Sequence, residues 1–112
     1  MRLRFAMAIL VAAGPAFAAQ PTEEQKEMRA GLLRVTLAEE CRKITGDEQI
    51  VTDAISALRI TAERNFPGSA DIASKINAFV KNEGNREKPS SGLVTPTTCK
   101  RVRSSIDAII NP

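Results

Sequence analysis

The sequence lacks histidine, tryptophan and tyrosine, and only 4% of its 112 residues are aromatic. Without an imidazole there can be no Ser-His-Asp triad, no Cys-His dyad and no zinc site built on histidine ligands. No histidine is present to move protons near neutral pH. Outside the first 18 residues, the aromatic side chains are Phe66 and Phe79, which leaves little surface to line a sugar or base pocket.

The remaining acid-base chemistry would have to come from carboxylates, and their placement does not favour it. The acidic residues form sequence-adjacent pairs at Glu23-Glu24, Glu39-Glu40 and Asp47-Glu48. Neighbours on a helix point about 100° apart, so such pairs do not converge on a metal ion. Two-carboxylate catalysis needs one group in an apolar pocket, and nearly every Asp and Glu falls on a polar helix face. We therefore expect a non-enzymatic protein with no catalytic residue, no metal site and no cofactor.

Long hydrophobic runs are also scarce, and the one at the start has the features of a cleaved secretory signal peptide (1–18). Arg2 and Arg4 form a positive segment, an apolar stretch follows to residue 13, and Gly14-Pro15 ends it. Ala16-Phe17-Ala18 supplies the small-x-small pattern that signal peptidase accepts. The apolar stretch is about nine residues, against roughly 20 needed to span a bilayer. We expect cleavage between Ala18 and Ala19, a periplasmic or secreted location, and no transmembrane anchor.

The excess of positive charge largely belongs to this leader. The sequence has 16 basic and 13 acidic residues, a net charge of +3 and a pI near 9.2. Loss of Arg2 and Arg4 leaves 14 basic residues against the same 13 acids. Residues 19–112 are thus nearly neutral. With the expected export and no aromatic residues interleaved among the basic ones, we predict no nucleic-acid binding.

Two cysteines, Cys41 and Cys99, lie in residues 19–112. An even number of cysteines in a small exported protein predicts a disulfide, and two allow one intramolecular pairing. The bridge would close a loop of 58 residues, for which the chain-entropy relation suggests roughly 4 kcal/mol. A free thiol and an intermolecular bridge are the alternatives.

Residues 19–112 are predicted to form a single all-α domain, a small bundle of about four helices whose first and last members the disulfide joins. The expected helices are 22–45, 47–65, 69–82 and 96–110, with a loop at 84–94. Apolar residues recur at helical spacing. The expected inward stripes are Leu33, Leu37, Cys41 and Ile44; Val51, Ile55, Leu58 and Ala62; Ile72, Ile76, Phe79 and Val80; and Cys99, Val102, Ile106 and Ile109 or Ile110.

Helix-end signals support these boundaries. Expected N-caps are Thr22 (with Gln25 in capping-box register), Asp47, Ser69 and Thr95 followed by Pro96. Gly46 is the expected cap at the end of the first helix, and Phe66-Pro67-Gly68 ends the second.

A basic stretch near the end of the chain is the candidate partner-binding patch. It contains Arg86, Lys88, Lys100, Arg101 and Arg103 against one acid, Glu87. The patch could face an anionic partner, and the loop holding Arg86 and Lys88 could be a recognition segment or a plain connector. The alternative for the patch is internal pairing, because the disulfide would bring Glu39 and Glu40 near Lys100 and Arg101.

These features favour a small exported protein-binding module, such as an envelope adaptor, an inhibitor or an immunity factor, whose partner is another envelope or periplasmic protein. Two alternatives remain. In overall plan the chain resembles acid-responsive periplasmic chaperones, which combine a cleaved signal, about 90 residues, helices throughout and one disulfide. That resemblance implies opening by self-repulsion once the carboxylates are protonated. An apolar small molecule or lipid held between the helices is the second alternative.

Overall fold

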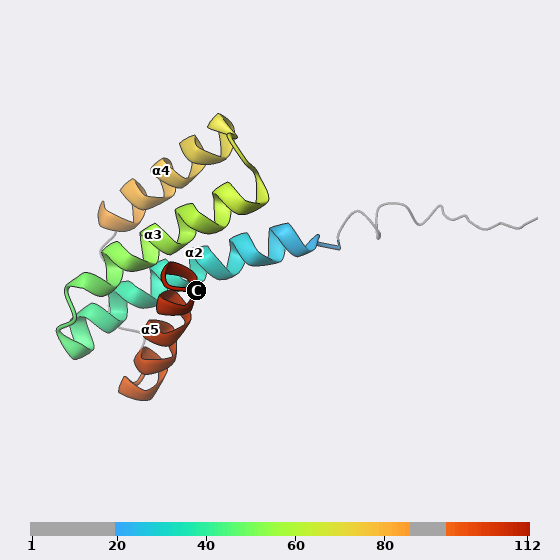
Figure 1. The fold of residues 1–112 in the computed structure, drawn as a ribbon. Helices are drawn as coiled ribbons and strands as arrows, with labels where there is room; N and C mark the ends of the chain where they lie inside the picture. Colours follow the sequence, from blue (N-terminus) through green and yellow to red (C-terminus); the bar gives the residue numbers. More distant parts are fainter. Residues whose placement is uncertain (1–19, 86–93) are drawn as a thin grey trace, which may run out of the picture.

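The computed structural model describes residues 20–85 and 94–112, and 83% of these are helical (Figure 1). There are four helices and no strand in this part of the chain. They are α2 (Glu23–Thr45), α3 (Gln49–Asn65), α4 (Ala70–Asn85) and α5 (Pro96–Ile110). The predicted all-α fold is confirmed. The predicted leader (1–18) lies outside the described residues, as does the greater part of the predicted loop.

The helix ends follow the local chemistry of the sequence. Thr22 forms a full capping box with Gln25, and Gly46 ends α2 in the left-handed conformation with φ of 77°. The Ser69 hydroxyl accepts a hydrogen bond from the Ile72 N–H at 3.1 Å. Thr95 caps α5 ahead of Pro96. Each cap satisfies a backbone group that the first or last turn leaves without a helical partner.

Two predicted boundaries differ from the structure by two residues or more. Helix α3 begins at Gln49, two residues later than expected, although the Asp47 carboxylate still accepts from the Gln49 N–H at 3.1 Å. Helix α4 continues to Asn85 and so includes Gly84, where the loop was expected to begin. A glycine costs a helix only about 1 kcal/mol relative to alanine, which did not suffice to stop α4 here.

Helix α3 lies at the centre of the arrangement. It packs against α2, α4 and α5, while α4 packs mainly against α3. Figure 1 shows α4, α3 and α2 side by side in that order, with α5 running steeply across α2 on the side away from α4. The largest fully buried side chains come from three of the four helices: Val35, Cys41, Ile50, Leu58 and Ile106.

The inward face of α2 is only partly the predicted one: Cys41 is buried and Leu37 packs against the core, as expected. Leu33 is 56% exposed and Ile44 is 38% exposed, whereas Val35 and Ala38 are buried. Gly31 also lies on the buried face, where a Cβ would come 2.8 Å from Leu58 Cδ1. The absence of a side chain at Gly31 therefore lets α3 approach on this side. Leu33 lies on a different side of α2, in a shallow hollow that Thr98 and Arg101 of α5 also line.

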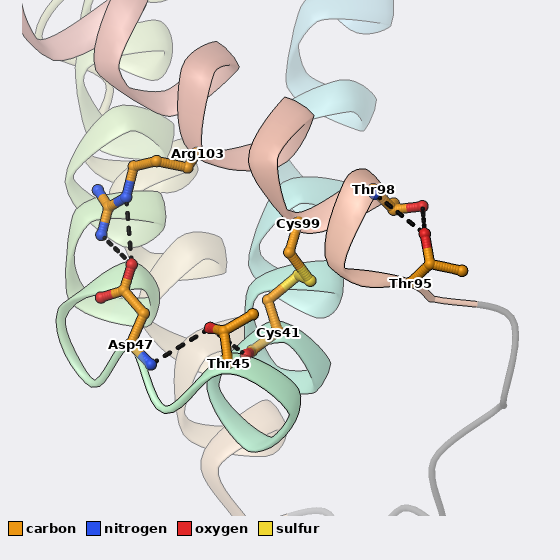
Figure 2. Close-up of a disulfide and its surroundings, with 7 residues drawn as sticks. All are labelled: Cys41, Thr45, Asp47, Thr95, Thr98, Cys99 and Arg103. Carbon is orange, nitrogen blue, oxygen red and sulfur yellow. Dashed lines mark hydrogen bonds and ion pairs between the residues drawn. A yellow bond between two sulfur atoms is a disulfide. The ribbon is translucent and has the colours of Figure 1, made fainter.

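The predicted disulfide is confirmed. Cys41 and Cys99 are bonded, with their Cα atoms 5.5 Å apart, and both side chains are buried. Figure 2 shows the bridge joining the C-terminal part of α2 to the first turn of α5. The first and last helices of the described chain are thus covalently tied around α3.

Candidate functional site: an apolar groove between two helices

The site that best fits a binding role is an open groove between the N-terminal half of α2 and the first half of α4. Its cavity volume is about 520 Å³. The Phe66-Pro67-Gly68 turn brings α4 back alongside the bundle, and Gly68 adopts a left-handed φ of 69° there. The lining residues are Gln25, Met28, Arg29, Leu32, Phe66, Ile72, Lys75, Ile76 and Phe79.

The walls of the groove are apolar, and its polar groups are few. Phe66 and Phe79, the two aromatic residues of 19–112, both line it. Gln25, Arg29 and Lys75 supply the polar atoms, and none of the lining residues is acidic. Such a concave apolar surface with a few polar groups is typical of a binding site.

The two cations of the groove differ in their surroundings. Lys75 Nζ lies 3.3 Å from the Asp71 carboxylate, and both side chains are more than 70% exposed. An ion pair so exposed is worth little, about 0 to 1 kcal/mol. Arg29 forms no ion pair with the residues that the structure describes.

One polar contact joins α4 to α2 near Leu32. The Thr36 hydroxyl of α2 lies 3.4 Å from Glu83 Oε1 of α4, and Glu83 is buried. At the opposite end, α4 leaves α3 through the turn at Phe66. Contacts at both ends of α4 therefore position the apolar row Ile72, Ile76 and Phe79 opposite Met28 and Leu32.

Sequence reasoning did not find this groove. Met28 and Leu32 lie on a flank of the predicted stripe of α2, and Ile72, Ile76 and Phe79 were expected to face inward. In the structure Ile76 is buried, while Ile72 and Phe79 stay half-buried along the groove. The sequence does contain one indication of it. Besides the stripe that packs against its neighbours, α2 has a second apolar row, Met28 and Leu32, which is more apolar surface than a single packing partner would cover.

The predicted basic patch is described only in part. Arg86 and Lys88 lie outside the described residues. Lys100 and Arg101 are exposed on α5. Arg103 is half-buried and directed toward α3 and the turn before it (Figure 2).

Arg103 is held by three carboxylates from three parts of the fold. Its guanidinium nitrogens lie 2.8 Å from Asp47 Oδ2, 2.8 Å from Asp53 Oδ2 and 3.2 Å from Asp107 Oδ1. These hydrogen bonds raise the pKa of Arg103, and the bond from Arg103 lowers the pKa of Asp53 below its usual value. A lowered carboxylate pKa is the opposite of what a general acid requires.

Of the two acids expected to pair with Lys100 and Arg101, Glu39 forms its ion pair elsewhere. Glu39 pairs with Arg42 on its own helix at 3.7 Å. In the described part of the basic stretch, Arg103 contacts the carboxylates of Asp47, Asp53 and Asp107. Internal pairing is therefore present in the described part of the patch, through residues that sequence reasoning had not selected.

A second hollow, of about 560 Å³, lies beside Arg103 and Lys100. Cys99 and Asp47 also line it, next to the disulfide shown in Figure 2. The guanidinium of Arg103 and the carboxylate of Asp47 already form an ion pair with each other, so these groups are less available to a ligand.

Within the described ranges, no cluster of three or more Cys, Asp or Glu side chains could hold a metal ion. No helix there is long and apolar enough to cross a bilayer. No protein-family model, curated protein or solved structure matches the chain.

Proposed function

We propose that the chain is a small exported, non-enzymatic protein-binding module whose docking surface is the groove between α2 and α4. The observation that carries this proposal is the groove itself, an open apolar surface that includes Phe66 and Phe79. Phenylalanine and methionine are enriched at the centres of protein interfaces, and Phe66, Phe79 and Met28 line this groove. The buried disulfide supports the expected export, because such bonds persist in oxidising compartments.

The proposal is tested by co-purification of the tagged protein from gently extracted envelopes. We expect to recover one stoichiometric partner. Its recovery should fall with Phe79→Ala, which removes an aromatic ring from the wall of the groove. Ile60→Ala is the matched control, because Ile60 is 38% exposed on α3 and does not line the groove. Circular dichroism and a melting curve establish that both variants fold.

Recovery of no partner would count against a protein-binding function. A partner that tolerates Phe79→Ala and is lost with Lys100→Glu and Arg101→Glu would place the docking surface on the predicted basic patch instead of the groove.

The volume of the groove supports a second candidate, an apolar small molecule or lipid. About 520 Å³ falls within the range of small-molecule sites, which is about 300 to 1,000 Å³. Native mass spectrometry of the purified protein tests it. A bound species of constant mass that Phe79→Ala removes would favour this candidate, and a ligand-free spectrum would oppose it.

A further inference from the structure

We propose that the groove binds one amphipathic α-helix of a partner protein, with carboxylates flanking the helix's apolar stripe. This inference rests on the proposed protein-binding function and specifies the chemistry of the partner. Its basis is the shape of the groove, the incomplete packing of α4 and the charge of the rim.

The walls of the groove are two helix surfaces. Because α3 runs opposite to both α2 and α4, these two run parallel to each other (Figure 1). Met28 and Leu32 form an i, i+4 row on one wall, and Ile72, Ile76 and Phe79 form a row on the other. Side chains of a third helix fit between such rows, as ridges into grooves.

The length of the groove also suits a helix. On α2 the lining extends from Gln25 to Leu32, about two turns or ~10 Å of helix axis. That length accommodates two or three anchor side chains at i, i+4 and i+7 spacing.

Within the described ranges, no second helix packs closely along α4 on this side. Helix α4 packs mainly against α3, and its apolar residues Ile72, Phe79 and Val80 remain half-buried. In a helix bundle each member buries its apolar stripe between neighbouring helices. A helix placed in the groove would contact both α2 and α4 and complete a four-helix unit around Phe66.

The rim determines the charge of the partner. Arg29 and Lys75 are its charged residues. Arg29 has no ionic partner among the described residues, and the exposed pairing of Lys75 with Asp71 leaves Lys75 accessible. Complementary charge on the incoming helix steers association and favours the correct partner.

Two labelled peptides test the inference by fluorescence anisotropy with the disulfide-bonded protein. Both carry the same leucine stripe at i, i+3, i+4 and i+7, flanked by glutamate in one and by lysine in the other. We expect the glutamate peptide to bind about tenfold more tightly, as two rim charge pairs allow. Arg29→Glu combined with Lys75→Glu should reverse this preference.

Arg64→Glu combined with Lys81→Glu is the matched control. It changes the same residue types at exposed positions of α3 and α4 outside the groove, so the preference for the glutamate peptide should persist. Equal affinity for the two peptides, or a preference that the Arg29 and Lys75 variant retains, would overturn the inference.

Other occupants give different results. Saturable binding of dodecanoate in the absence of peptide binding would assign the groove to an acyl ligand. A dimer in sedimentation equilibrium that Phe79→Ala dissociates would assign it to a second copy of the chain. Either result overturns the inference. If neither peptide binds while a co-purified partner still depends on Phe79, the inference fails and the protein-binding function stands.

Discussion

At the scale of single residues, Arg103 does the most to join separate parts of the fold. Its guanidinium binds Asp47 in the turn before α3, Asp53 within α3 and Asp107 on its own helix α5. The planar fork of arginine donates several hydrogen bonds at once, which a lysine could not reproduce. Because the side chains of Arg103 and Asp53 are only 27% and 26% exposed, solvent screens these contacts less than it screens an ordinary surface pair.

Arg103→Met should lower the free energy of unfolding at pH 7 by about 1–3 kcal/mol, between the values for exposed and buried ion pairs. The loss arises because three carboxylates remain close together without their cation. Urea denaturation measures it. Arg64→Met, an exposed arginine outside any ion pair of the described residues, should change the free energy of unfolding by less than about 0.5 kcal/mol.

The stability should also depend on acid through Asp53. The pKa of Asp53 is lowered from 3.8, mainly because Arg103 donates a hydrogen bond to its carboxylate. A lowered pKa in the folded state means that Asp53 contributes stability above its unfolded pKa and loses that contribution as the pH falls through the folded pKa. The difference in urea midpoint between the wild type and Asp53→Asn should therefore be constant from pH 7 to about pH 5 and shrink below about pH 4. A difference that persists unchanged at pH 2 would contradict this.

At the scale of elements, α2 carries apolar residues on several sides, and its neighbours decide which of them are buried. Gly31 marks the close approach of α3, where Leu58 occupies the space that a side chain would take. On another side Arg34 Nε donates a hydrogen bond to Ser105 Oγ of α5 at 2.7 Å. On a third, Met28 and Leu32 remain available to the groove.

Two glycine substitutions should have opposite effects. Gly31→Ala should destabilise the protein by about 1–2 kcal/mol, since its Cβ would lie 2.8 Å from Leu58 Cδ1 in a filled core. Gly84→Ala should stabilise it by about 0.5–1 kcal/mol, because alanine favours the helix and meets no atom within 4 Å there. Thermal unfolding of the two variants measures both changes, and a shift in the same direction for both would contradict the packing at Gly31.

Helix α4 should be the least protected of the four. Its packing is mainly against α3, and Ile76 is its contribution to the buried core cluster, so it can open while the core residues of α2, α3 and α5 stay packed against one another. Hydrogen exchange followed by mass spectrometry should show faster exchange in peptides from residues 70–85 than in those from 49–65. Equal protection of the two segments would show that α4 opens only with the whole domain.

At the scale of the whole molecule, the disulfide supplies a large part of the stability. It closes a loop of 58 residues and ties the ends of a bundle that has few large apolar side chains in its core. By restricting the unfolded chain it contributes roughly 4 kcal/mol, a substantial share for a domain of this size.

Reduction of the disulfide should lower the melting temperature by well over 10 °C, at roughly 4 to 8 °C for each kcal/mol lost. Because Cys41 and Cys99 are 0% and 4% exposed, reductant should act slowly on the native protein and faster in denaturant. Melting with and without reductant after a denaturing incubation provides the test. An unchanged melting temperature would show that the bridge contributes little.

Local patterns in the sequence were enough to predict the four helices, the caps at Thr22, Gly46 and Ser69, and the disulfide. Capping groups lie within a few residues of the backbone atoms they satisfy, helical periodicity is local, and two cysteines allow one intramolecular pairing. The features that could not be predicted depend on contacts between residues far apart in the chain. Arg103 meets carboxylates 56 and 50 residues away, and the groove joins α2 to α4, which are not consecutive. The tertiary structure also brings the two aromatic residues of 19–112 together. Phe66 and Phe79 are 13 positions apart in the sequence, and both line the same groove.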